Sequence, residues 1–88
     1  MFSFNNFVIM YEYKLKYATK EQALEDLLSK QVLTIEEGKY SLGQNINCVV
    51  ELAGIEGVEG YHYDVLSAVE INFGDKEIFP NNPKHKFL

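Results

Sequence analysis

Apolar and polar residues alternate from Tyr61 to Phe73, and this alternation constrains the fold of the chain more than any other feature. A period of two residues over such a length is typical of a β-strand with two different faces. One face carries six apolar or aromatic side chains: Tyr61, Tyr63, Val65, Val69, Ile71 and Phe73. The other face carries His62, Asp64, Glu70 and Asn72, with Leu66 and Ala68 as its only apolar members. We therefore expect the first face to lie against a core and the second to be the solvated outside of a sheet.

This stretch is too long for one ordinary strand. At about 3.3 Å per residue it would span roughly 43 Å, about twice the usual strand length. We expect a bend or bulge at Leu66–Ala68, so that two strand segments are hinged near Ser67.

A second strand is predicted over Phe7–Tyr17, where the odd positions are again apolar or aromatic. Val8 and Met10 are apolar too, so this end is expected to be covered on both faces or buried against a partner. Met1 and Met10 are both possible starts of translation. Losing Phe7 and Ile9 from the inward row would cost on the order of 2–3 kcal/mol each, which favours Met1.

A helix is predicted from Lys20 to Lys30. Thr19 and Gln22 have the spacing of a capping box, which marks the start of a helix. An apolar stripe at three- and four-residue spacing follows, formed by Ala23, Leu24, Leu27 and Leu28. Glu21, Glu25 and Asp26 are expected to face water. Eleven residues do not hold a helix alone, so the stripe is expected to pack on the sheet.

The middle of the chain gives weaker signals. Gln31–Ile35 is a short strand or an extended connector, and Glu36–Lys39 is a turn by composition. Tyr40–Asn47 is polar and yields no assignment. Cys48–Ala53 is predicted to be a strand, and Gly54–Gly60 is predicted to be the hairpin tip that joins it to Tyr61.

After Phe73 the chain is predicted to turn at Gly74–Lys76 and to run extended over Glu77–Phe79. Pro80–Leu88 is expected to be an extended, partly exposed arm, because its two prolines exclude a central strand. Its last residues, Phe87 and Leu88, are expected to dock on this chain or on another. Together, these predicted elements indicate a compact α+β domain over residues 1–79, in which the helix covers a mostly antiparallel sheet of three to five strands.

Charge and cysteine content exclude several classes of protein. The 88 residues carry a net charge of -5 and contain no arginine, which argues against binding to nucleic acid. Cys48 is the only cysteine, so no internal disulfide can form, and we expect a cytoplasmic location. The first ten residues lack the basic region and cleavage site of a signal peptide, and no run is long enough to span a membrane.

Metal binding and catalysis have few candidate residues. His62 and Asp64 share a strand face, with His85 and Cys48 as conceivable further ligands or, for Cys48, a nucleophile. Two ligands do not make a metal site, so we expect His62 and Asp64 to be surface residues. No motif presents Cys48 as a nucleophile, so we expect it to be a small buried residue. Two glutamate pairs, Glu36 with Glu37 and Glu56 with Glu59, lie in solvated turns. We therefore predict no catalytic residues, no metal and no cofactor.

A row of tyrosines accompanies the two long strands. Its members are Tyr11, Tyr13, Tyr17, Tyr61 and Tyr63. Without a cationic groove they do not form a stacking platform for nucleic acid or sugar, so we expect them to pack under the helix. Any that are exposed would suit a protein interface.

The segment Gly60–Leu66, followed by Phe79-Pro80-Asn81-Asn82-Pro83-Lys84-His85-Lys86-Phe87, resembles small proteins encoded among the structural genes of tailed phages and prophages. The likeness covers about the last third of the chain. It implies a virion or tail-assembly component without enzymatic activity.

We therefore expect a non-enzymatic protein–protein interaction module that binds a protein partner or a second copy of itself, uses sheet edges and the C-terminal arm, and binds neither nucleic acid nor membrane. It would then reside in the cytoplasm or in a virion. The alternatives are a small acidic regulatory or inhibitor-like protein and, third, a metal-dependent or hydrolytic enzyme. The expected interaction residues are Tyr61, His62, Asp64, Phe79, Pro80, Pro83, His85, Phe87 and Leu88.

Overall fold

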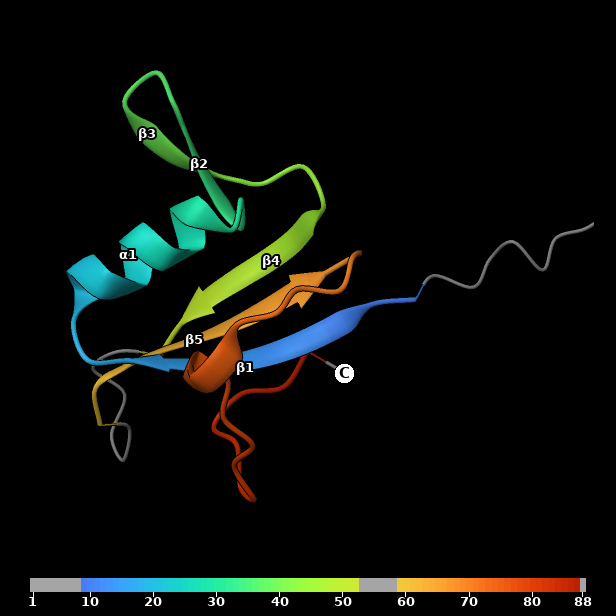
Figure 1. The fold of residues 1–88 in the computed structure, drawn as a ribbon. Helices are drawn as coiled ribbons and strands as arrows, with labels where there is room; N and C mark the ends of the chain where they lie inside the picture. The colour runs from blue at the N-terminus through green and yellow to red at the C-terminus, as the bar shows by residue number, and fades with distance from the viewer. Residues whose placement is uncertain (1–8, 53–58, 88) are drawn as a thin grey trace, which may run out of the picture.

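The computed structural model describes residues 9–52 and 59–87, and it has an α+β fold, as predicted (Figure 1). The elements in chain order are β1 (Tyr11–Tyr17), α1 (Lys20–Ser29), β2 (Leu33–Glu36), β3 (Lys39–Leu42), β4 (Ile46–Glu51), β5 (Tyr61–Ser67) and the short 3-10 helix η2 (Gly74–Lys76). Among the described residues, one sheet contains three antiparallel strands in the order β1-β5-β4, and a second contains β2 and β3. No helix in the described ranges is both long and apolar enough to cross a membrane.

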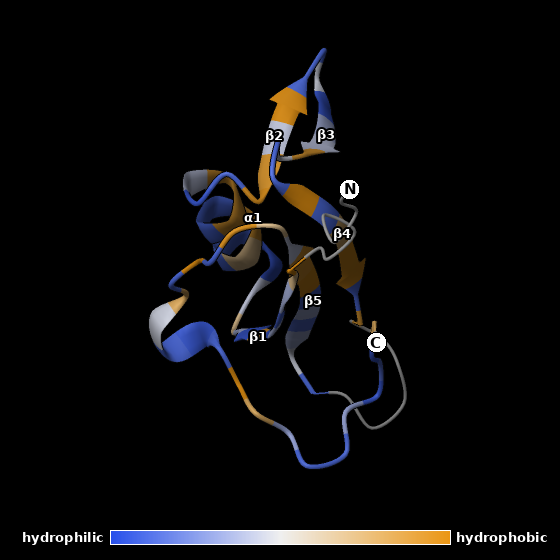
Figure 2. Cartoon of the chain, turned by 90° about the vertical axis from the view of Figure 1, so that its right-hand side faces the viewer, coloured by the Kyte–Doolittle hydropathy of each residue, from blue (hydrophilic) through white to orange (hydrophobic). Residues whose placement is uncertain are grey.

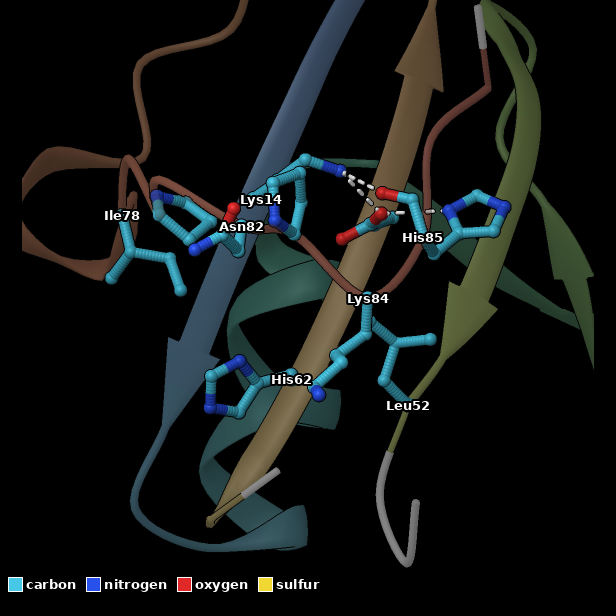
Figure 3. Close-up of a pocket in the computed structure, with 10 residues that line it drawn as sticks. Lys14, Leu52, His62, Ile78, Asn82, Lys84 and His85 are labelled. Carbon is cyan, nitrogen blue, oxygen red and sulfur yellow. Dashed lines mark hydrogen bonds and ion pairs between the residues drawn. The ribbon is translucent and has the colours of Figure 1, made fainter. Parts of the chain in front are cut away.

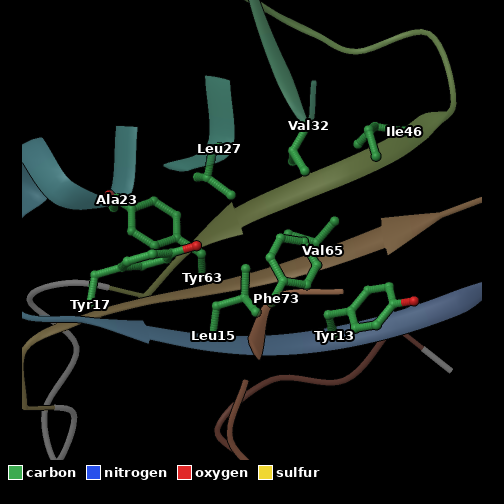
Figure 4. Close-up of a cluster of buried hydrophobic side chains, with 10 residues drawn as sticks. All are labelled: Tyr13, Leu15, Tyr17, Ala23, Leu27, Val32, Ile46, Tyr63, Val65 and Phe73. Atoms are coloured by element: carbon green, nitrogen blue, oxygen red, sulfur yellow. The ribbon is translucent and has the colours of Figure 1, made fainter. Parts of the chain in front are cut away.

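The inward row of β5 packs as its alternation predicts. Register pairs Leu15 of β1 with Tyr63, and Tyr13 with Val65, so the odd rows of the two strands share one face. These four side chains are buried, and with Tyr17 they form the floor of the core in Figure 4. The predicted packing role of the tyrosines is therefore confirmed for these core members.

Helix α1 covers this inner face. The Thr19 hydroxyl accepts a hydrogen bond from the Gln22 amide at 3.1 Å, and Ala23 and Leu27 are fully buried. The helix ends in a Schellman motif: Gln31 adopts a positive φ of 61°, and the Val32 amide donates to the Leu27 carbonyl.

Asp26 was predicted to face water, but its carboxylate is bound by two neighbouring side chains. The buried Tyr17 hydroxyl donates to its carboxylate at 2.6 Å, and Lys30 forms an ion pair with it. Burial and this hydrogen bond raise the pKa of Tyr17, and burial together with a hydrogen bond to Glu51 raises that of Tyr63.

The predicted second strand segment after Ser67 is wrong. The register pairs Ser67 with Tyr11 on one side and with Ile46 on the other, which are the first residues of β1 and β4. Residues 68–73 therefore pair with no strand within the described part of the chain. They still cover the core, since Phe73 is buried and the Ile71 amide donates to the Tyr13 hydroxyl at 2.8 Å.

The first strand is also shorter than predicted. It begins at Tyr11, and Ile9 is exposed rather than part of the inward row. Phe7 and Val8 lie outside the described residues.

Strands β2 and β3 form a hairpin that stands away from the main sheet (Figure 1). Glu37 and Gly38 both have positive φ, as the tight turn of a two-residue hairpin requires. The segment that gave no assignment, 40–47, thus holds most of β3 and the start of β4. Most of the predicted Gly54–Gly60 tip lies outside the described residues.

Candidate functional site

The outer face of β5 holds a buried carboxylate, which contradicts the expectation of a solvated face. Alternation turns Asp64 outward, and register places it beside Lys14 of β1. Asp64 is nevertheless only 2% exposed. It is buried because the C-terminal arm folds back over this face instead of extending into solvent (Figure 1).

Lys14 is the centre of a polar network between the sheet and the arm. Its Nζ donates to Asp64 Oδ2 at 2.6 Å, to the His85 carbonyl at 2.6 Å and to Glu12 Oε2 at 3.2 Å. An ammonium has three protons, so all of its donors are used. Burial alone would lower the pKa of Lys14, but the hydrogen bonds and charges of Asp64 and Glu12 outweigh it and raise the pKa.

The arm is attached to its own chain through this network. His85 Nδ1 lies 2.7 Å from Asp64 Oδ2, and the Phe87 amide donates to Glu12 at 3.2 Å. Upstream, the Ile78 amide donates to the Lys14 carbonyl at 2.8 Å. The arm therefore docks on its own chain up to Phe87. Leu88 lies outside the described residues.

A cavity of about 140 Å³ remains between the arm and the sheet (Figure 3). Among the predicted interaction residues, five line it: His62, Asp64, Pro80, Pro83 and His85. Lys14, Lys84 and Asn82 add polar groups, and Leu52 and Ile78 add apolar walls.

The other predicted interaction residues lie elsewhere. Phe79 is largely exposed, Tyr61 packs on the margin of the core, and Phe87 stacks edge-on against His85.

Few reactive side chains are available for catalysis or metal binding at this cavity. His62 Nε2 contacts the Glu59 carbonyl at 2.7 Å, and His85 is held by Asp64. Cys48 pairs in register with Leu66, is half-buried rather than buried, and does not line the cavity. Within residues 9–52 and 59–87, no three histidine, cysteine or acidic side chains gather as metal ligands would.

A second candidate surface, which the sequence analysis missed, is the β2–β3 hairpin. Register pairs Ile35 with Tyr40 and Leu33 with Leu42, so these four apolar side chains share one face. Leu33 packs against the core, but Ile35, Tyr40 and Leu42 are 58%, 53% and 45% exposed. We call these last three residues the hairpin face. Figure 2 shows the hairpin rising clear of the main sheet, with an apolar stretch along β2.

The base of the polar side of the hairpin is partly covered, whereas Glu36 and Lys39 nearer the turn are exposed. Thr34 and Ser41 pair on the opposite face and are both half-buried, and the buried Thr34 hydroxyl has no hydrogen-bond partner among the described residues. A two-stranded hairpin in water normally hides its apolar face. A signal for this arrangement was present in the sequence, since Leu33 and Ile35 mirror Tyr40 and Leu42 across the turn.

Comparison with protein-family models, curated proteins and solved structures finds no match to this chain.

Proposed function

We propose that this chain is a non-enzymatic protein–protein interaction module whose main contact surface is the hairpin face. The observation that carries this proposal is the exposed apolar face of the hairpin, with more than half of Ile35 and Tyr40 exposed while the Thr34 hydroxyl on the other face is buried. Contiguous exposed apolar side chains on a protruding element are typical of binding surfaces.

The size of the surface suits a binding anchor. Fully burying one large apolar side chain stabilises a complex by about 1.5–3 kcal/mol. Ile35, Tyr40 and Leu42 already have about half of their surface covered, so each would contribute on the order of 1 kcal/mol. Tyrosine is among the residues enriched at the centres of interfaces, and Tyr40 is the aromatic member here.

In its more specific form, the proposal is that the chain is a structural or assembly protein derived from a tailed phage. The resemblance of Gly60–Leu66 and of the Pro-X-X-Pro-X-His-X-Phe tail supports this form. Neighbouring capsid, portal or tail genes would strengthen it, and neighbours unrelated to virion assembly would count against it.

The test compares tagged chains recovered from the cells that produce them. A chain with Ile35→Ser and Tyr40→Ser should lose its co-purifying partner, because its apolar anchors are removed. Val69→Ser is the matched control, since Val69 is an apolar side chain with 41% exposure outside the hairpin. The control should keep the partner.

Two results would contradict the proposal. Retention of the partner by the hairpin variant would remove the hairpin from the interface. Binding that ignores the hairpin substitutions but weakens steeply with added salt would instead favour the acidic regulatory alternative.

A further inference from the structure

The cavity beneath the C-terminal arm has the dimensions of a small-molecule site. Its volume is about 140 Å³, and an apolar cavity of about 150 Å³ in another protein accommodates benzene. One side is the outer face of the sheet and the other is the arm, so the cavity requires the arm to be docked on the sheet.

The walls of the cavity are mainly apolar. Leu52 at the end of β4, Ile78, Pro80 and Pro83 supply carbon surfaces, and Leu52 is itself buried. Proline rings are rigid and lose little side-chain entropy when a ligand packs on them. A compact apolar group would therefore find a preformed surface.

The charged side chains of the lining differ in whether an oppositely charged group binds them. Asp64 is compensated within the network, because its Oδ2 accepts from both Lys14 and His85, and Lys14 has no donor left. Glu12, the second carboxylate on Lys14, is not part of the lining. Lys84 forms no ion pair with any described carboxylate.

The Lys84 side chain extends along the cavity. It is exposed and, in Figure 3, extends past Leu52 toward the end of the cavity where His62 lies. Asn82, also in the lining, can add an amide N–H donor. Among the described lining residues, the groups without a partner are thus the Lys84 ammonium, the Asn82 amide and the second oxygen of Asp64, Oδ1, and Lys84 is the cation of this set.

From this arrangement we propose that the cavity binds a small organic carboxylate with a compact apolar body, such as a single ring. The ring lies between Leu52 and the prolines, and the carboxylate lies at the mouth beside Lys84. This site is separate from the hairpin face, so it does not depend on the proposed interaction.

The experiment is an NMR titration of the full chain with three probes. Benzoate has the proposed chemistry, benzyl alcohol keeps the ring without the charge, and inorganic phosphate keeps a charge without the ring. Benzoate should shift the amides of His62, Asp64, Asn82, Lys84 and His85 saturably. Benzyl alcohol and phosphate should each bind at least about fivefold more weakly, the equivalent of roughly 1 kcal/mol.

Two lysine variants make the test specific. Lys84→Gln should weaken benzoate binding about five- to tenfold, whereas Lys86→Gln, an exposed lysine of the same arm outside the lining, should leave it unchanged. An unshifted Ile78 amide, which donates to the Lys14 carbonyl, in both variants would confirm that the arm stays docked. Absence of saturable benzoate shifts, equal binding of either other probe, or equal effects of the two lysine variants would overturn the proposal.

Discussion

Replacing Asp64 by asparagine should destabilise the whole domain, although the two side chains have nearly the same shape. The carboxylate is 2% exposed and accepts charge-assisted hydrogen bonds from Lys14 at 2.6 Å and from His85 at 2.7 Å. Removing one partner of a buried ion pair typically costs 3–5 kcal/mol. Lys14 keeps Glu12 and the His85 carbonyl as acceptors, so we expect a lower value, about 2–3 kcal/mol in the free energy of unfolding.

Urea denaturation and thermal melting measure this loss. For a domain of this size, 1 kcal/mol corresponds to a fall of about 4–8 °C in the melting temperature, so the variant should melt roughly 8–24 °C lower. Hydrogen exchange adds a local readout. The Phe87 amide, which donates to Glu12 beside the network, should exchange faster in the variant because the arm loses its attachment.

Two further variants separate the buried charge from other effects. Asp75→Asn, on the exposed turn η2, should change stability by less than about 0.5 kcal/mol. The double variant Lys14→Met with Asp64→Leu should be more stable than Asp64→Leu alone, because it removes an ammonium that has lost the closest of its two carboxylate partners. An Asp64→Asn chain that melts with the parent and keeps its Phe87 protection would refute this account of the network.

Four other substitutions and the pH dependence of stability test the fold. A Cβ on Gly43 would lie 1.8 Å from the Gln31 carbonyl oxygen, so Gly43→Ala should lower the unfolding free energy by on the order of 3 kcal/mol; Gly38→Ala, which is strained only by its positive φ, should cost about 1–2 kcal/mol. Gln31→Gly should stabilise the chain by about 0.5–1 kcal/mol in the same denaturation assay, since Gln31 is exposed and holds the left-handed position that glycine favours. The contribution of Tyr17 and Tyr63 to stability should be constant up to about pH 10 and then fall, because the unfolded chain releases tyrosine protons that the raised pKa values of these two residues retain in the folded state. Tyr17→Phe should lower stability at pH 7 by about 1–2 kcal/mol yet flatten the alkaline loss, and an unchanged slope would contradict this assignment.

Local signals predicted much of the fold. The Thr19 cap and the following stripe predicted α1, and alternation predicted the paired part of β5 and its inward row. Alternation could not predict where β5 ends. That limit is set by the register at Ser67, where β1 and β4 both begin. Register depends on residues some fifty positions away and is not encoded in a local period.

The candidate site depended even more on distant contacts. His62, Asp64 and His85 were identified by residue type. The burial of Asp64, however, requires Lys14 beside it on β1 and a C-terminal arm that folds back so that His85 contacts it. A polar residue on a strand face gives no local sign that a terminal segment will cover it. The hairpin face was missed for a different reason: its two halves were assessed separately, and only their pairing across the turn brings Ile35 and Tyr40 together.

Site-specific photo-crosslinking tests the proposed interaction most directly. A benzophenone amino acid in place of Tyr40 should yield one discrete crosslinked product in the cells that produce the chain. Excess wild-type chain should compete this product away, and the chain with Ile35→Ser and Tyr40→Ser should not. The same photoreactive group in place of Glu25, on the exposed side of α1, should yield no such product. Equal crosslinking from both positions, or competition by the hairpin variant, would contradict the assignment of the hairpin face as the contact surface.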